Sequence, residues 1–113
     1  MGSIRYAHIT IEFEDRLLEH LHVVIVQKFL RGESFSMSWL DALSIGDGRS
    51  SIWLHPQSDV RFKFAGSRVP AISTEWLRLL SESANSSRGL IVVDEHGKLA
   101  LSLIHISEPT RPY

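Results

Sequence analysis

The chain has 113 residues, and its 12 Lys and Arg against 13 Asp and Glu give a formal net charge of −1. This balance excludes a protein that binds nucleic acid or a membrane surface through a large basic excess. The absence of cysteine excludes disulfides, thiolate metal sites and cysteine nucleophiles. No secretory signal or membrane-spanning run is evident, so we expect one cytoplasmic domain without a membrane partner.

The first part of the chain predicts strands and then a long buried helix. Ile9, Ile11 and Phe13 alternate with polar residues, as in a half-buried strand, and a shorter strand is expected before them. The helix is predicted over about residues 15–31, with Asp15 as its N-cap and Gly32 as its stop. Its apolar side is expected to hold Leu17, Leu18, Leu21, Val24, Ile25, Phe29 and Leu30. The residues left for solvent are Arg16, Glu19, His20, Gln27 and Arg31.

Three strands and a second helix follow. Phe35, Met37 and Trp39 alternate with serines, and two further alternating segments lie at about 51–56 and 60–64. Their short links predict an antiparallel meander. A shorter helix is predicted over about residues 74–85 with Ser73 as its cap, and residues 89–93 predict a last strand.

The expected fold class is therefore α+β. It is a mainly antiparallel sheet of about five or six strands, in the order β(β)αβββαβ, with one long buried helix and one shorter helix. We expect a single domain over residues 1–100. Residues 101–111 read LSLIHISEPTR, which resembles the translation of a transposase mosaic end and sequencing adapter. We interpret residues 101–113 as a non-native tail, although the apolar content would also suit a strand.

No catalytic or metal-binding constellation is predicted. His20 and His22 are two positions apart, so on a helix they point about 200° apart and cannot share an ion. No HExxH spacing for zinc and no GxSxG motif for a serine nucleophile is present. We therefore assign no catalytic residue, no metal ligand and no cofactor.

Two segments contain candidate binding residues. In the loop IGDGRSS and the strand after it, Arg49 with Ser50 and Ser51 could contact an anion beside Trp53, or the loop could simply connect strands. Basic residues near Trp53 could bind nucleic acid through phosphate pairing and stacking, or form an ordinary solvated strand face. The candidate binding residues are Arg49, Ser51, Trp53, His55, Arg61, Lys63 and Arg68.

A family resemblance covers about residues 3–94. It is carried, in chain order, by DRLLEHLHVVIVQKFLRGESF, SW, GDGRSSIWLHP, FKFAGSRVP, EWLRLLSESANS and GL. These segments resemble a family of small actinobacterial proteins of unknown function, which genome records often label ATP-dependent DNA ligase. The label implies ATP and Mg²⁺ as cofactors and a nucleophilic lysine in Lys-x-Asp-Gly-x-Arg. Around Asp47-Gly48 the lysine position is Ile45 and the arginine position is Ser50, so this motif is not found here.

Three functional hypotheses follow. The first is a small non-catalytic binding or interaction module, with a homodimer through Trp39, Trp53 or a sheet edge as one form of partner. The second is an accessory protein that contacts nucleic acid through Arg49, Arg61, Lys63 and Arg68. The third is the ligase activity that the family label implies.

Overall fold

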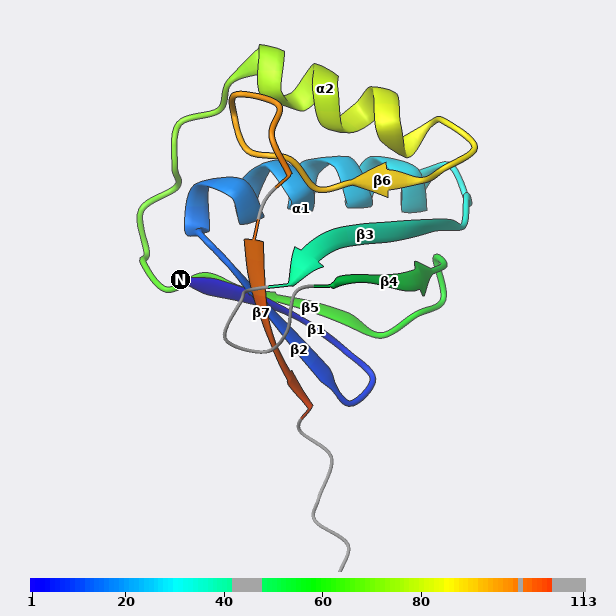
Figure 1. The fold of residues 1–113 in the computed structure, drawn as a ribbon, viewed down its shortest axis with the longest axis horizontal. Coiled ribbons are helices and arrows are strands. Elements are labelled where there is room, and N and C mark those ends of the chain that lie inside the picture. Colours follow the sequence, from blue (N-terminus) through cyan, green and yellow to red (C-terminus); the bar gives the residue numbers. More distant parts are fainter. Residues whose placement is uncertain (42–47, 100, 107–113) are drawn as a thin grey trace, which may run out of the picture.

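A computed structural model of the chain describes residues 1–41 and 48–99 in full and residues 101–106 as backbone. The predicted loop positions Ile45 and Asp47 lie outside the described residues. Figure 1 shows the path of the chain. The elements in order are β1 (Gly2–Tyr6), β2 (Ile9–Phe13), α1 (Asp15–Leu30), β3 (Phe35–Asp41), β4 (Arg49–Leu54), β5 (Val60–Lys63), α2 (Thr74–Ala84), β6 (Leu90–Ile91) and β7 (Leu101–Ile106).

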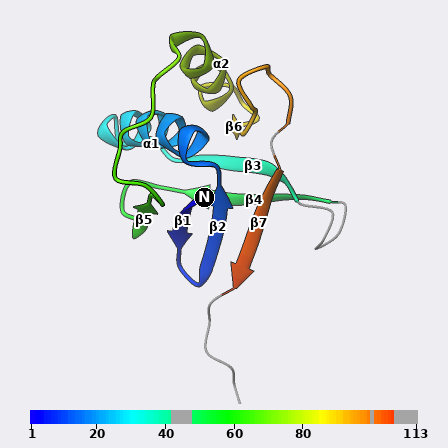
Figure 2. The same ribbon diagram turned by 90° about the vertical axis from the view of Figure 1, so that its left-hand side faces the viewer.

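The strands form one sheet in the order β4-β3-β7-β2-β1-β5, and β6 lies along β3. The pairs β1–β2, β1–β5, β2–β7 and β3–β4 are antiparallel, whereas β6 and β7 run parallel to β3. Figure 2 shows that β3 and β4 run across the direction of β1, β2 and β7. The predicted α+β class, with a mainly antiparallel sheet, is confirmed.

The predicted meander is wrong at its third strand. β5 pairs with β1 rather than with β4, and Ile4 lies directly opposite Phe62. This pairing places Phe62 beside a fully buried core residue. The alternation within β5 specifies which side chains face the core, but it does not specify the neighbouring strand, so the short link from β4 suggested the wrong partner.

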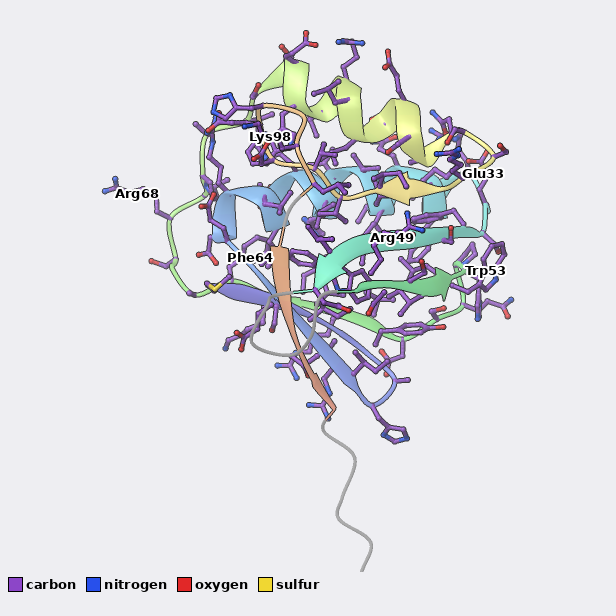
Figure 3. All side chains as sticks on the ribbon, in the orientation of Figure 1. Glu33, Arg49, Trp53, Phe64, Arg68 and Lys98 are labelled. Atoms are coloured by element: carbon purple, nitrogen blue, oxygen red, sulfur yellow. The ribbon has the colours of Figure 1, made fainter. Side chains whose placement is uncertain are left out.

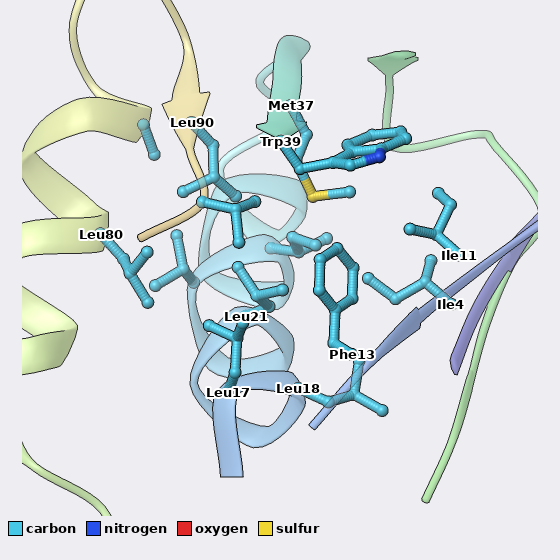
Figure 4. Packing of buried hydrophobic residues seen from close by; sticks show 14 of the residues in the cluster. Ile4, Ile11, Phe13, Leu17, Leu18, Leu21, Met37, Trp39, Leu80 and Leu90 are labelled. Atoms are coloured by element: carbon cyan, nitrogen blue, oxygen red, sulfur yellow. The ribbon is translucent and has the colours of Figure 1, made fainter. Parts of the chain in front are cut away.

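The core lies between the sheet and α1, with α2 on the far side of α1 (Figure 1). Figure 4 shows side chains of α1, β2, β3 and β6 meeting there. Trp39 is 1% exposed, and its ring meets the ring of Phe13 edge to face at 6.4 Å. Such a geometry is favourable for aromatic pairs. Trp39 is therefore a core residue, and the predicted interface role for it is wrong.

Both ends of α1 are fixed by hydrogen bonds, from the backbone at the C-terminus and from the Asp15 side chain at the N-terminus. At the C-terminus, Gly32 has φ +70°; its N–H donates to Phe29 O, and Glu33 N–H donates to Lys28 O. This is a Schellman motif, as the glycine predicted. At the N-terminus the cap position is Glu14, so Asp15 is not the N-cap. The Asp15 carboxylate instead accepts the N–H groups of Ala65 and Gly66, at 3.1 and 2.9 Å. It therefore ties the segment after β5 to the start of the helix.

Two predictions about the faces of α1 are wrong. Leu30 is 75% exposed, whereas His20 is fully buried. His20 stacks on Trp76 of α2 with ring centroids 4.3 Å apart. Its Nε2 accepts the N–H of Ser73, and its Nδ1–H donates to Arg16 O. Because both ring nitrogens have partners, this polar side chain can be buried between the two helices.

The hairpin between β1 and β2 turns through Ala7 and His8, with Tyr6 opposite Ile9. Ala7 takes φ +55°, a left-handed conformation that favours glycine. The structure thus shows a two-residue turn at a place where the residue types do not predict one.

Candidate functional site

The outer surface of β1, β2 and β5 carries a group of polar and basic side chains. Along each strand the apolar residues face α1, so the residues between them face away from the core. The outward residues that border one shallow hollow of about 260 Å³ are Ser3, Arg5, Thr10, Arg61 and Lys63. We call these five residues the basic sheet face.

The strand register places the cations of this face close together. Arg5 lies directly opposite Arg61 across β1–β5, and Ser3 lies opposite Lys63. On the other side of β1, Arg5 lies opposite Thr10. Directly opposite residues have Cβ atoms about 4.5–5.5 Å apart, and like charges in such positions destabilise the pair.

These cations have no carboxylate partner in the part of the chain that the structure describes. Among the described residues, Arg5, Arg61 and Lys63 take part in no ion pair and no side-chain hydrogen bond. Two carboxylates lie at the margin of the face. Glu12 is opposite Ser3, and Asp59 borders a second hollow of about 430 Å³ together with Arg5 and Arg61. Among the described residues, no ion pair joins Asp59 to these cations.

Several other cations of the chain are paired with carboxylates. Arg78 is paired with Glu75 and Glu82 on α2. Arg16 Nη1 lies 2.8 Å from Glu95 Oε2 on the turn after β6. Arg5, Arg61 and Lys63 differ from these cations because they border the same hollow and form no ion pair among the described residues.

Lys28 and Glu33 form the most buried of these pairs. Lys28 Nζ lies 2.9 Å from Glu33 Oε1, and the side chain of Lys28 is 9% exposed. The hydrogen bond from Lys28 lowers the pKa of Glu33, because it stabilises the ionised carboxylate. The charge of Lys28 is thus neutralised within the protein.

The structure separates the candidate residues predicted from the sequence. Arg61 and Lys63 lie together on the basic sheet face. Arg49, Ser51 and Trp53 alternate along β4, at the other end of the strand order, and all three are exposed. His55 follows β4 and is half-buried. Arg68 lies in the link between β5 and α2, on the opposite side of the molecule from Trp53 (Figure 3). The structure therefore does not form one patch from Arg49, Arg61, Lys63, Arg68 and Trp53.

Three residues of the basic sheet face were not predicted from the sequence: Ser3, Arg5 and Thr10. Arg5 is the one that carries charge. It alternates with Ile4 and Tyr6 in β1, so the strand pattern could have placed it on the outer side. The pattern could not show that β5, far along the chain, lies beside it. Thr10 was missed for the same reason, since its role depends on the β1–β2 register.

The chemistry available on this face is anion binding. An arginine guanidinium offers a planar fork of donors that matches two oxygens of a phosphate, and a lysine adds a point charge. The hydroxyls of Ser3 and Thr10 can donate to the same oxygens. Within residues 1–41 and 48–99, no three His, Asp or Glu side chains converge where they could hold a metal ion. No helix in the described part of the chain is long and apolar enough to cross a membrane.

The fold and the site define a small α+β domain whose sheet carries three basic side chains that are unpaired among the described residues. Residues 1–95 match the model of a family described as a domain of unknown function, DUF7882, and the chain belongs to that family. No curated protein matches the chain, and no solved structure does.

Proposed function

We propose that this chain is a non-catalytic binding module that holds phosphate groups of a nucleic acid against its basic sheet face. The observation that carries this proposal is the direct opposition of Arg5 and Arg61, neither of which has a carboxylate partner among the described residues. This arrangement costs stability in the free protein. An anion between the two guanidinium groups would remove the repulsion and engage both donor forks.

The shape of the surface favours a chain of phosphates over a single small anion. The two hollows beside Arg5 and Arg61 share these arginines as borders. Successive phosphates of one strand could therefore contact the same pair from both sides. Lys63 extends the cationic surface along β5, beyond Arg61. A nucleic acid would supply several phosphates at once, and each contact releases counterions and adds affinity.

The proposal assigns binding and no reaction. The ligase activity that genome labels imply would need a lysine nucleophile. Lys28 is held by Glu33 and Asn85, with Nζ 3.2 Å from Asn85 Oδ1. Lys63 is exposed on β5, and it serves as a phosphate contact in the present proposal. We also propose a cytoplasmic location, where such a partner is available.

The proposal can be tested by fluorescence anisotropy with labelled single-stranded DNA, duplex DNA and single-stranded RNA at several salt concentrations. We expect the logarithm of the association constant to fall linearly with the logarithm of the salt concentration. Arg5→Ala, Arg61→Ala and Lys63→Ala should each weaken binding, and each should reduce the salt slope by about 1. All three side chains lie on the outer sheet surface, so these variants should fold.

The matched control is Arg88→Ala, which removes the same charge from an exposed position between α2 and β6. It should change the affinity much less than Arg61→Ala does. The proposal is wrong if no salt-dependent binding occurs, or if the control weakens binding as much as the variants of the basic sheet face. Arg49→Ala tests whether the exposed surface of β4 contributes to binding. We expect this variant to bind as the control does.

A further inference from the structure

A second polar groove lies away from the basic sheet face, where the ends of α1 and α2 meet β3 and β4. Its volume is about 170 Å³, and its lining includes Lys28, Ser34, Ser36, Trp53, Asn85 and Ser87. Drug-sized ligands occupy pockets of about 300 Å³ or more, so this groove suits a single ring. Figure 3 shows Trp53 on the same side of the molecule as Glu33.

Trp53 is the exposed aromatic residue of this groove, since Phe35, which also lines it, is buried. It lies on the outer side of β4, opposite Ser36, and is 59% exposed. The other two tryptophans, Trp39 and Trp76, are buried in the core. A tryptophan has a large apolar face, and leaving it in water forgoes the gain from burial. A ligand with one flat apolar face could cover it.

The polar side chains of the groove are oriented but not saturated. Asn85 Oδ1 accepts hydrogen bonds from Lys28 Nζ and Arg31 Nη2, at 3.2 and 3.4 Å. These bonds fix the amide and leave its Nδ2 donors without a partner among the described residues. The hydroxyls of Ser34 and Ser87 likewise have no partner there. The groove therefore offers amide donors and hydroxyl groups next to an indole face.

The charge of the groove selects a neutral ligand. Lys28 lines it, but its ammonium is paired with Glu33 at 2.9 Å. Arg31 approaches the same carboxylate at 3.4 Å. Arg31 does not line the groove, and Lys28, the cation that does, is already paired with Glu33, so a phosphate would gain little here. A neutral ring with several hydroxyls would gain hydrogen bonds from Asn85, Ser34 and Ser87 while its apolar face covers Trp53.

We infer that this groove binds one neutral sugar ring, stacked on Trp53 and hydrogen-bonded by Asn85. The site is separate from the basic sheet face in both position and chemistry. Its existence does not depend on nucleic-acid binding, and a failure of either proposal leaves the other intact.

The test is a titration of ¹⁵N-labelled protein with D-glucose, N-acetyl-D-glucosamine and cellobiose, each up to its solubility limit. The readouts are the indole Nε1–H signal of Trp53 and the Nδ2–H₂ signals of Asn85. We expect at least one sugar to shift both sets of signals saturably. The indole signals of Trp39 and Trp76 should stay in place because both rings are buried. Trp53→Ala should weaken the response at Asn85 about tenfold or more, as expected for loss of an aromatic anchor.

Trp53 is an exposed side chain, so the alanine variant should keep its fold, and an unchanged melting temperature would show this. The inference is overturned if no sugar in the panel shifts Trp53 and Asn85. It is also overturned if a neutral nucleoside, uridine, shifts both residues while every sugar leaves them unchanged, because the groove would then select a base. The Asn85 signals could also shift linearly without saturation, and by the same amount in the native protein and in Trp53→Ala. Such a result would show solvent effects only and would refute the site.

Discussion

Arg5 and Arg61 lie directly opposite each other on neighbouring antiparallel strands, and neither has a carboxylate partner among the described residues. A cross-strand pair of like charges weakens a sheet, while a pair of opposite charges strengthens it. The position is thus unfavourable for folding and favourable for binding an anion.

The first prediction separates these two effects with Arg61→Glu. The new carboxylate would face Arg5, so we expect the free energy of unfolding to rise by up to about 1 kcal/mol. Nucleic-acid binding should be lost in the same variant. Urea denaturation and anisotropy measure the two quantities. Arg88→Glu makes the same change in net charge and should leave stability nearly unchanged. A less stable Arg61→Glu protein would contradict our account of the pair.

The second prediction concerns His20, which joins the two helices. His20→Phe can keep the stacking on Trp76, but it removes the acceptor of the Ser73 N–H. An unsatisfied donor at this position should lower the free energy of unfolding by about 1–3 kcal/mol, measured by urea denaturation.

The same substitution at His22 is the matched control for His20→Phe. His22 lies on the same helix and packs against Phe62 at 4.6 Å between ring centroids, with no hydrogen bond to any described residue. His22→Phe should therefore lower the free energy of unfolding much less than His20→Phe does. Equal losses at positions 20 and 22 would show that the hydrogen bond to Ser73 does not stabilise the junction.

The third prediction is a pH dependence that comes from Asp15. The N–H groups of Gly66 and Ala65 lower the pKa of the Asp15 carboxyl, because they stabilise its ionised form. A carboxyl whose pKa is lower in the folded state stabilises the protein above its unfolded pKa of about 3.9, and this stabilisation is lost as the pH falls through the folded pKa.

Asp15→Asn should consequently be less stable than the native chain at pH 7, and the difference should shrink at strongly acidic pH. Urea midpoints of both proteins across this range are the measurement. Glu33 and Asp94 also have lowered pKa values, but they are common to both proteins and cancel in the comparison. A difference in midpoint that does not vary with pH would exclude the proposed role of the ionised carboxylate.

The fourth prediction concerns the end of the chain. We propose that residues 101–113 are not native, since residues 101–111 resemble translated adapter, and the family match ends at residue 95. Residues 101–106 form β7, which pairs with β2 and β3, and His105 lies opposite Thr10 in the strand register. None of the five residues of the basic sheet face belongs to this segment. Amplification and sequencing of the gene from genomic DNA should give different codons after about residue 100. Recovery of the same codons from the genome would refute this proposal.

Local patterns predicted the individual elements well. The alternation of Phe35, Met37 and Trp39 with serines specified β3 and its buried face, and Gly32 specified the end of α1. These features depend on neighbours within a few residues. The serine cap of α2 is confirmed as well, since the Ser73 hydroxyl accepts the N–H of Trp76 at 3.2 Å.

Features that depend on pairing between distant segments were not predictable. His20 was expected in solvent because its burial requires both Trp76 and the Ser73 N–H, which come from a segment far along the chain. The predicted binding residues were grouped by closeness in sequence, but β5 pairs with β1. Arg61 and Lys63 therefore lie beside Arg5, while Trp53 and Arg68 lie elsewhere.

The most direct test of the central claim is to observe the two opposed arginines during ligand binding. We would record the Nε–Hε signals of the arginine side chains by NMR while adding a short single-stranded DNA. If both guanidinium groups hold phosphates, the Arg5 and Arg61 signals should shift together, saturate, and return as salt is added. The Arg68 and Arg88 signals should remain in place. Shifts confined to Arg49 or Arg68, or no shift at Arg5 and Arg61 when DNA binds, would contradict this claim.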